Sequence, residues 1–484
     1  MIHSTLLANN LTEESATQRR RRYGLQRVVC EIDALLAAQL DVILHHPTFQ
    51  QLEASWRSLY ALVCIAQDPL QHSALANSNL IQIKMLSISW REVGRDLEHV
   101  NDPEQSELFK LIYSHGLDMP GANPFSVLVG DYKISHGFQT HRMVDDTATL
   151  SGLSYIASAA LCPFITGVDK RLFDVTSMQA ITIEPQRLEK LFNGPSHSDW
   201  RQLRQEENTR FLGLTFPDIL LRSPYILDGD GGRLRYRETT HQAENDYLWG
   251  NSAYAYASTL MKTFAETGWF VNLSKGLSEV FYEADHDAPV DQRLQHYLPF
   301  GMDPYCVAPR ATTSVQLDTH TERTLAQLGF IPLSSRHSQQ DSRFYYSPSV
   351  NQPKEYMDGI ATTNARMTAC LAYTFGASRI AHHLKVYGRS RIGSDTTSST
   401  IQRDISQYLH HYTTRNVEGL SAERLKKPLA NYRVTVQRRL GVSGSYSSVI
   451  HLQPHGQCDQ VMGEIRLATS TRMAENNVTG ITQE

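Results

Sequence analysis

Apolar residues recur at three- and four-residue steps along residues 361–393, the longest helical pattern in the chain. The positions that share this spacing are Cys370, Tyr373, Ala377, Ile380, Ala381, Leu384 and Tyr387. Such spacing lines one face of a helix. Thr362 or Thr363 can cap its start, and Gly388 or Gly393 can end it. We therefore expect one long, buried helix here.

Two amphipathic helices are expected near the amino terminus, after a flexible arm over residues 1–24. The first spans residues 26–44, and Pro47 opens the second, where a first-turn proline is tolerated. One face of the second helix carries Phe49, Leu52, Trp56, Leu59 and Val63. Two such helices cannot bury both of their apolar stripes alone, so they must dock on the rest of the chain or on another subunit.

The middle of the chain alternates between strand and helix patterns. Residues 81–88 alternate like a half-buried strand. Strands at 125–131 and 163–168 flank a small-residue helix at 145–161, which predicts a βαβ unit with parallel strands. Further patterns predict a helix over 245–267 and a strand, helix and strand over 315–333.

After the long helix, a shorter helix is predicted over 402–413, followed by strands at 433–440, 446–452 and 461–468. The turn-rich sequence between the first two strands predicts a hairpin. The fold class is thus mixed α/β. We divide it into an amino-terminal arm with docking helices (1–75), a middle α/β domain (76–345) and a carboxy-terminal domain with two helices and a small sheet (346–484).

Composition is that of a soluble globular protein, with 484 residues, 41% hydrophobic and 20% charged. The formal net charge of -4 gives no reason to expect nucleic acid. The only dense basic run is Arg19–Arg22, a solvated helix start or a patch for an anionic partner. Six scattered cysteines fit a reducing cytoplasm. No apolar run approaches the ~20 residues that cross a bilayer, so we expect a cytoplasmic protein.

The sequence contains no catalytic or metal-binding constellation that we recognise, and we expect no cofactor. The loop that starts at Asp228 resembles a calcium loop, but Thr239 stands where an EF-hand needs glutamate. Adjacent histidines such as His382–His383 point apart on a helix and do not converge on one ion. Gly130–Asp131 follows a strand, where the carboxylate could belong to an active site, but the sequence shows no second catalytic residue to act with it. A structural role is therefore favoured over an enzyme.

Several stretches together resemble one family, the large subunit of the contractile sheath of bacterial type VI secretion systems, called TssC or VipB. The matching stretches run in order over about nine-tenths of the chain: HPTFQQLEASWRSLYALV from His46, FSVLVGD from Phe125, RFLGLTFPDILLRSPY from Arg210, DYLWGNSAYAYA from Asp246, LGFIPL from Leu328, residues 364–394, and LQPH from Leu452. Gly456 departs from the pattern, where the family has a large apolar residue.

The resemblance implies a non-enzymatic protein that pairs with a smaller sheath subunit. These heterodimers stack helically around an inner tube of ring-shaped proteins, assemble from a baseplate and contract to propel the tube. A AAA+ ATPase recycles the sheath and contacts the large subunit only indirectly. The last domain resembles that of phage tail sheaths. A phage-type tail sheath and a cytoplasmic α/β enzyme with a site near Gly130–Asp131 are the alternatives.

Three sets of contact residues follow as expectations. The small subunit docks on Phe49, Leu52, Trp56 and Leu59. The inner tube meets either a basic face of the long helix or the helix over 402–413; that basic face carries Arg379, His382, Lys385 and Arg389. The last strand leaves its own subunit and pairs with a neighbour. Its contact residues are Val461, Ile465 and Leu467.

Overall fold

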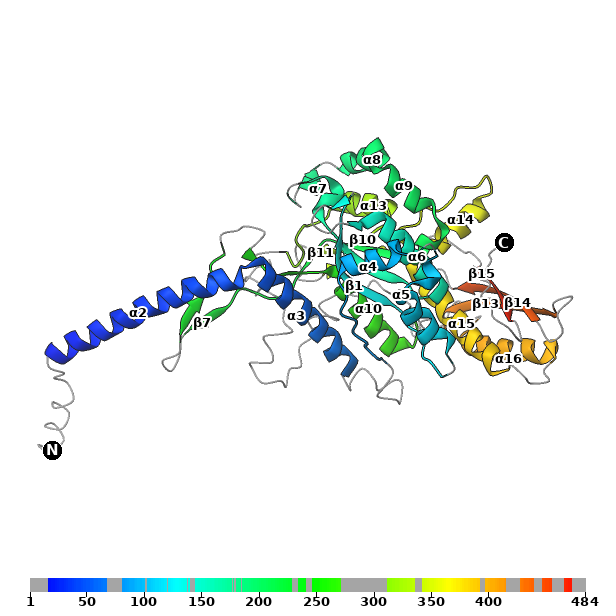
Figure 1. The fold of residues 1–484 in the computed structure, drawn as a ribbon, viewed down its shortest axis with the longest axis horizontal. Coiled ribbons are helices and arrows are strands. Elements are labelled where there is room, and N and C mark those ends of the chain that lie inside the picture. The colour runs from blue at the N-terminus through cyan, green and yellow to red at the C-terminus, as the bar shows by residue number, and fades with distance from the viewer. Residues whose placement is uncertain are drawn as a thin grey trace, which may run out of the picture.

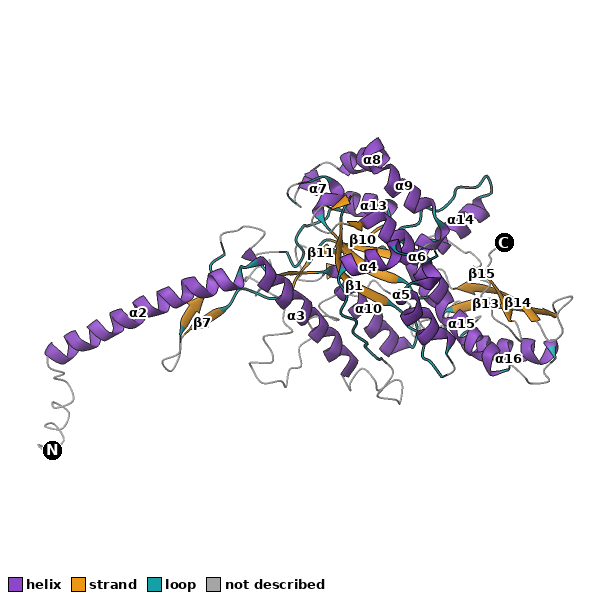
Figure 2. Cartoon of the chain, viewed as in Figure 1, coloured by secondary structure: helices purple, strands orange, loops and turns teal. Residues whose placement is uncertain are grey.

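The computed structural model describes residues 16–67, 81–100, 102–119, 121–136, 138–139, 144–175, 177, 180–183, 185–228, 234–240, 246–270, 311–335, 342–391, 397–414, 427–438, 446–454 and 465–471. One long helix projects from a rounded body, and a small sheet lies at the opposite end (Figure 1). Figure 2 shows the same view by secondary structure, with helices around a central sheet.

The projecting helix is α2 (Ala16–Leu44), and a short link leads to α3 (Pro47–Gln67), which continues from it along the body (Figure 1). The two predicted amino-terminal helices are therefore present. However, α2 starts within the stretch expected to be a flexible arm, where Gln18 and the four arginines that follow it are good helix formers.

A four-stranded parallel sheet forms the centre of the body, in the order β1 (Leu128–Ile134), β4 (Phe164–Val168), β5 (Leu212–Phe216) and β10 (Phe330–Pro332). The predicted βαβ unit is confirmed: α6 (Asp146–Ala160) connects β1 to β4. Every residue of β4, β5 and β10 is buried, as expected for a parallel sheet covered on both faces.

Each face of this sheet has its own hydrophobic core. On one face, Trp200, Phe173 and Phe330 pack with α6, α9 (Ser198–Gln205) and the π-helix η3 (Lys110–Asp118). On the other face, Tyr256 of α10 (Ser252–Thr267) packs with Ile165 and residues of α3 and α15. The sheet thus holds α3 and α10 on one side and the remaining middle helices on the other.

The smaller elements complete this middle region. The helices are α4 (Trp90–Glu98), η2 (Pro103–Gln105), α5 (Glu107–Phe109), η4 (Lys170–Phe173), α7 (Ala180–Ile183), α8 (Pro185–Asn193), η5 (Pro195–His197), η6 (Glu207–Phe211) and α13 (Thr319–Gln327). The two-stranded pairs are β2 (Phe138–Gln139) with β3 (Val144–Asp145), β6 (Ile219–Leu220) with β9 (Trp249–Gly250), β7 (Ile226–Asp228) with β8 (Arg235–Arg237), and β11 (Ser334–Ser335) with β12 (Ser342–Arg343).

The carboxy-terminal region contains α14 (Gly359–Thr368), α15 (Leu371–Ser390), α16 (Ser398–His411) and a three-stranded antiparallel sheet. Its strands are β13 (Leu429–Arg438), β14 (Tyr446–Pro454) and β15 (Ile465–Thr471). The predicted hairpin of β13 and β14 is confirmed. A third core, which includes Ile380, Leu409 and Ile450, joins α15 and α16 to this sheet.

The single helix expected over residues 361–393 is wrong: the chain breaks at Cys370, whose backbone is extended. The backbone N–H and the hydroxyl of Ser349 both donate to the carbonyl of Ala369, at 2.8 and 2.7 Å. The N–H of Leu371 donates to the carbonyl of Ser347 at 2.9 Å. The segment that contains Ser347 and Ser349 thus bonds to backbone groups that a continuous helix would bond internally. Hydrophobic periodicity alone does not reveal this break in the helix.

Three further expectations differ from the structure. Residues 81–88 do not form a strand within this chain. The helix expected over 245–267 begins only at Ser252, because the side chain of Asn251 caps it by accepting from Ala253 N. Within 315–333, the structure has α13 and β10 but no strand before α13. The last two patterns were correct in type but too long at their amino-terminal ends.

Candidate assembly surfaces

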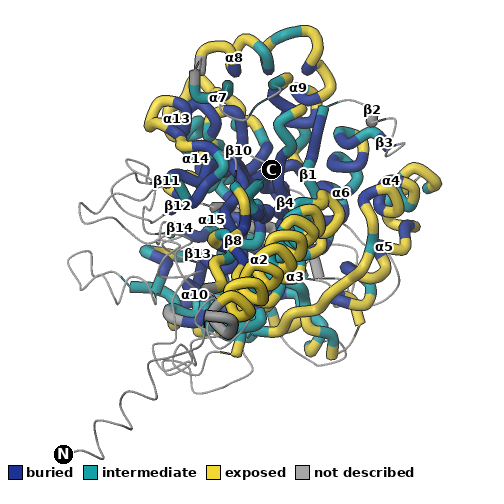
Figure 3. The backbone as a smooth tube through the Cα atoms, turned by 90° about the vertical axis from the view of Figure 1, so that its left-hand side faces the viewer, coloured by how far each residue is buried: buried dark blue, intermediate teal, exposed yellow. Residues whose placement is uncertain are grey.

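The amino-terminal helices expose a large apolar surface. Most of α2 is solvent-exposed (Figure 3), and its uncovered side chains include Tyr23, Leu25, Val28, Val29, Ile32, Leu35, Leu36, Val42 and Ile43. Monomeric soluble proteins rarely leave a contiguous apolar surface of this extent open to water. The exposed face of α2 is therefore a candidate site for another polypeptide.

The four predicted docking residues lie on the face of α3 that points away from the body. Phe49, Leu52 and Trp56 are 38%, 56% and 56% exposed, and Leu59 is half-buried. The opposite face of α3, with Ala61, is buried against the core that contains α10. The predicted residues are thus available to a partner, and their contact with a small subunit stays a prediction.

A buried group of charges holds the junction of these helices on the body. We call it the Arg222 cluster; its members are Glu53, Arg57, Arg222, Tyr225 and Glu238. The guanidinium of Arg222 contacts Glu53 at 2.9 Å and Glu238 at 2.6 and 3.2 Å. Arg57 of α3 donates to Glu53 at 2.8 Å and to the hydroxyl of Tyr225 at 2.6 Å. The cluster ties α3 to two loops of the body.

The end of α2 joins the same network. His45 lies 3.2 Å from Glu238, and Tyr236 donates to Asp41 at 2.6 Å. Burial opposes the charge of Arg222, but its bonds to Glu238 and Glu53 raise its pKa above the ordinary arginine value. A permanently charged arginine between two buried carboxylates therefore sets how α2 and α3 leave the body.

No local sequence pattern predicts the Arg222 cluster. Glu53 and Arg222 are 169 residues apart, and Glu238 lies in a segment without helical or strand periodicity. Only the fold brings them together. The single pointer in the sequence is the position of Arg222 directly after a run of buried apolar residues, where a charge needs a partner.

In the single chain, the basic face expected to meet the inner tube packs against the middle region, and its contact with the tube stays a prediction. His382 is 8% exposed and lies 2.8 Å from the carbonyl of Ala160. The guanidinium of Arg379 stacks over the ring of Phe264 at 4.5 Å. Sequence periodicity identified the face correctly but could not show that the middle region covers it.

The other two basic residues of this face bind the π-helix η3. The ammonium of Lys385 lies 5.1 Å from the ring centre of Tyr113, and burial lowers the pKa of Lys385 to about 8. Arg389 donates to the carbonyls of Leu117 and Met119, which end η3. Cations suit the carboxyl end of a helix, so these residues fasten α15 to the body.

We expect the buried position of His382 to make the protein sensitive to mild acid. Burial lowers its pKa, so the unfolded chain binds a proton more readily than the folded chain. Stability is therefore lost as pH falls through the ordinary histidine pKa of about 6.5, by up to about 1.4 kcal/mol per pH unit. His382→Gln, which can still donate to Ala160, should flatten the pH dependence of the unfolding free energy between pH 7 and 5.5.

His411→Gln, at an exposed position, is the matched control for the loss of a histidine side chain in this measurement. Denaturant unfolding at several pH values gives the comparison. A His382→Gln variant whose stability falls as steeply as that of the parent would contradict the assignment.

The last strand folds back in the single chain. β15 pairs antiparallel with β14 over seven residue pairs, among them Ile465 with Leu452 and Leu467 with Ile450. Val461 lies outside the described residues. The expected exchange with a neighbour is thus not the arrangement of the isolated chain, and it stays a prediction for the assembled state.

The enzyme alternative gains no support from the described residues. The carboxylate of Asp131 accepts hydrogen bonds from the hydroxyl of Ser55 on α3 and from the side chain of Tyr254 on α10. Among the described residues, no three His, Cys, Asp or Glu side chains are grouped to hold a metal ion. Most of the loop after Asp228 lies outside the described residues. Where the structure describes the chain, it contains no helix suited to cross a membrane.

Comparison with known proteins identifies the family. Residues 26–351 match the model of the EvpB/VC_A0108 tail sheath N-terminal domain, and residues 360–471 match the EvpB/VC_A0108 tail sheath gpW/gp25-like domain. The chain is 30% identical over 479 residues to the type VI secretion system sheath protein TssC1 of Pseudomonas aeruginosa, covering 97% of this chain and 90% of that protein. This chain therefore belongs to the EvpB/VC_A0108 family of tail sheath proteins and is a structural subunit of a type VI secretion contractile sheath.

Proposed function

We propose that this chain is the large, non-enzymatic sheath subunit that pairs with a small sheath subunit through α2 and α3. The uncovered apolar faces of these two helices carry the proposal, because they resemble half of a domain core and obligate interfaces have that character. The heterodimers then stack helically in the cytoplasm around an inner tube, start from a baseplate and contract to drive the tube outward. A AAA+ ATPase acts on the sheath after contraction.

Co-expression tests this function directly. The chain and the small sheath subunit of the same secretion system should co-purify and form tubes visible by negative-stain electron microscopy. Discrete particles without tubes would contradict the proposal. Tubes formed by this chain alone would instead point to a one-chain sheath of the phage type.

Trp56→Ala should weaken capture of the small subunit without affecting the free chain. Trp56 is 56% exposed in the single chain, so removing its side chain should break few contacts within the free chain. At an interface a tryptophan anchor is worth about 2 kcal/mol or more, which is about a 30-fold change in affinity. Pull-down with the small subunit and the thermal melting of the free chain measure the two effects.

Gln51→Ala, an exposed polar change on the same helix, is the control and should bind normally. Equal capture by the Trp56→Ala variant, or a large drop in the melting temperature of the free chain, would show that this face is not the docking surface.

For contact with the inner tube we propose α16 in place of the covered face of α15. Its outward side carries Gln402, Arg403, Gln407, His410 and His411, all exposed. Rim contacts of this polar kind are individually weak, about 0–1 kcal/mol each. Many of them add along a filament, yet each can be released when the sheath contracts.

We also propose that β15 is exchanged between neighbouring subunits in the assembled sheath. Ten residues, 455–464, connect β14 to β15, and an extended chain of that length reaches up to about 35 Å. Domain swapping replaces an intrachain pairing with the same pairing to a neighbour. The β14–β15 register of the single chain is therefore the register that a donated strand would form.

A further inference from the structure

One buried carboxyl group in the middle region has no cation to balance its charge. Glu322 lies in the first turn of α13 and is 6% exposed. Burial raises the pKa of its carboxyl group, and no positively charged side chain of the described chain is among the groups that act on it. The buried carboxylate of Glu238, in contrast, is paired with Arg222. Glu322 therefore differs from the acidic side chains of the Arg222 cluster.

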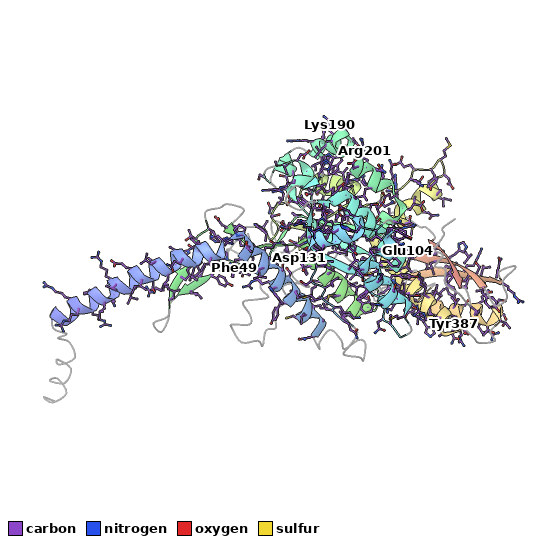
Figure 4. The ribbon with its side chains drawn as sticks, in the orientation of Figure 1. Phe49, Glu104, Asp131, Lys190, Arg201 and Tyr387 are labelled. Atoms are coloured by element: carbon purple, nitrogen blue, oxygen red, sulfur yellow. The ribbon has the colours of Figure 1, made fainter. Side chains whose placement is uncertain are left out.

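The described elements that pack around α13 supply no such cation. α13 packs on β10, whose residues are all apolar, and on α8. The charged side chains of α8 are exposed: Arg187, Glu189 and Lys190. Figure 4 shows Lys190 at the outer edge of the body. Arg343 lies opposite Ser334 in the β11–β12 pair, but its charge is not among the influences on Glu322. On α13 and at its cap, the remaining titratable side chains are exposed: Asp318, His320 and Arg323.

Two buried polar atoms at this place make no hydrogen bonds. The hydroxyl group of Ser334, at the start of β11, is close enough to the carboxyl group of Glu322 to favour its charged form. However, Ser334 Oγ and Glu322 Oε1 make no hydrogen bond within the part of the chain that the structure describes. Burial without hydrogen bonds is unfavourable for a polar atom, and burial without a counter-charge is far more unfavourable for a carboxylate. A proton on the carboxyl group removes the charge and supplies a donor for the hydroxyl oxygen.

We propose that Glu322 is a proton-binding site, and that its carboxyl group is neutral in the folded chain at pH 7. The O–H group of the acid then donates to the hydroxyl oxygen of Ser334 and joins α13 to β11. Loss of the proton leaves a negative charge between α13 and the edge of the central sheet, where β10 is the last strand. Alkaline pH therefore weakens the attachment of α13, a property separate from pairing with the small subunit.

A helix terminus and a metal ion are the two other ways to stabilise a buried carboxylate. The amino-terminal end of α13 favours a carboxylate, but by much less than burial without a cation disfavours it. Glu322 and Ser334 offer one carboxyl group and one hydroxyl group, whereas Ca²⁺ takes about six to eight oxygen ligands. Among the described residues, no three His, Cys, Asp or Glu side chains are grouped to hold a metal ion. The proton is the ligand that these two groups can hold.

The pH dependence of unfolding tests this site. A group whose pKa is raised by folding holds its proton more tightly in the folded chain, so stability is lost as pH rises above the ordinary glutamate pKa of about 4.3. Glu322→Gln keeps the shape of the side chain and cannot ionise. Between pH 5 and 7, the unfolding constant of the parent should rise at least about tenfold relative to that of Glu322→Gln, since one such proton contributes up to about tenfold per pH unit. The comparison cancels the contributions of other groups, such as His382.

Glu189→Gln, at an exposed position on α8, is the matched control for the loss of a carboxyl group. A ratio of unfolding constants that stays constant from pH 5 to 7 overturns the proposal. The same pH-dependent change in Glu189→Gln overturns it as well. So does a Glu322→Gln chain that fails to fold, because a neutral amide should be tolerated where a neutral acid is.

Infrared spectroscopy of the full-length chain detects the proton directly. At pH 7, the parent should show the carbonyl band of a protonated carboxylic acid, and Glu322→Gln should lack that band. Equal spectra of the two chains in this region overturn the proposal. The melting temperature is also measured in sodium, potassium, calcium and choline chloride at constant ionic strength. A dependence on the metal cation that is present in the parent and absent in Glu322→Gln would assign the carboxylate to a bound cation and overturn the proton site.

Discussion

Arg222→Ala should destabilise the chain by about 3–5 kcal/mol, because it leaves the buried carboxylate of Glu238 without its arginine and leaves Glu53 with Arg57 alone. These carboxylates are 2% and 11% exposed, so water cannot replace the lost guanidinium. Denaturant unfolding measures the loss. Capture of the small subunit should fall as well, since the cluster positions α2 and α3.

Two controls separate this effect from a general loss of charge. Arg27→Ala removes an exposed arginine paired with Glu31 on α2 and should cost no more than about 0.5 kcal/mol. Glu53→Gln and Glu238→Gln, added to Arg222→Ala, should restore part of the stability by removing the unpaired charges. A cost below 1 kcal/mol at pH 7 would contradict the role of the cluster.

Truncation after Pro454 should abolish sheath formation while leaving a folded heterodimer. It removes β15 and every pairing that β15 makes with β14. If the strand belongs to a neighbouring subunit, the truncated chain keeps its middle region and its small-subunit surface but cannot link subunits. Small-subunit capture, circular dichroism and electron microscopy measure the three properties.

A chain truncated after Thr471 is the matched control, because it keeps β15 and lacks only the polar tail that follows. It should build tubes like the parent. Loss of folding of α15 and α16 in the shorter chain would show that β15 serves its own subunit. Full-length contractile tubes from the shorter chain would contradict both arrangements.

The sequence predicted those parts of the fold in which local pattern and tertiary packing agree. The apolar runs at 125–131 and 163–168, separated by a helical pattern, predicted the parallel pair that β1 and β4 form. Pro47 predicted the start of α3. These features depend on neighbours in sequence.

The misplaced features depend on residues far away in sequence. The break at Cys370 arises because Ser347 and Ser349 take hydrogen-bonding groups from the helix. The basic face of α15 looks solvent-exposed in the sequence, yet η3 and α10 cover it. The Arg222 cluster joins residues 169 positions apart. In each case a long-range contact overrides or adds to what the local pattern allows.

The projection of α2 has a mechanical consequence. A helix of 29 residues is about 43 Å long, and hydrogen bonds of Asp41 and of His45, just beyond it, hold its carboxyl end on the body. It therefore acts as a lever: a rotation of about 10° at that end displaces the far end by roughly 7 Å, given this length. Small angular changes at the junction thus become displacements as large as the distances across a contact between subunits. The stiffness of the Arg222 cluster therefore determines how much of a motion in one subunit is transmitted to the next.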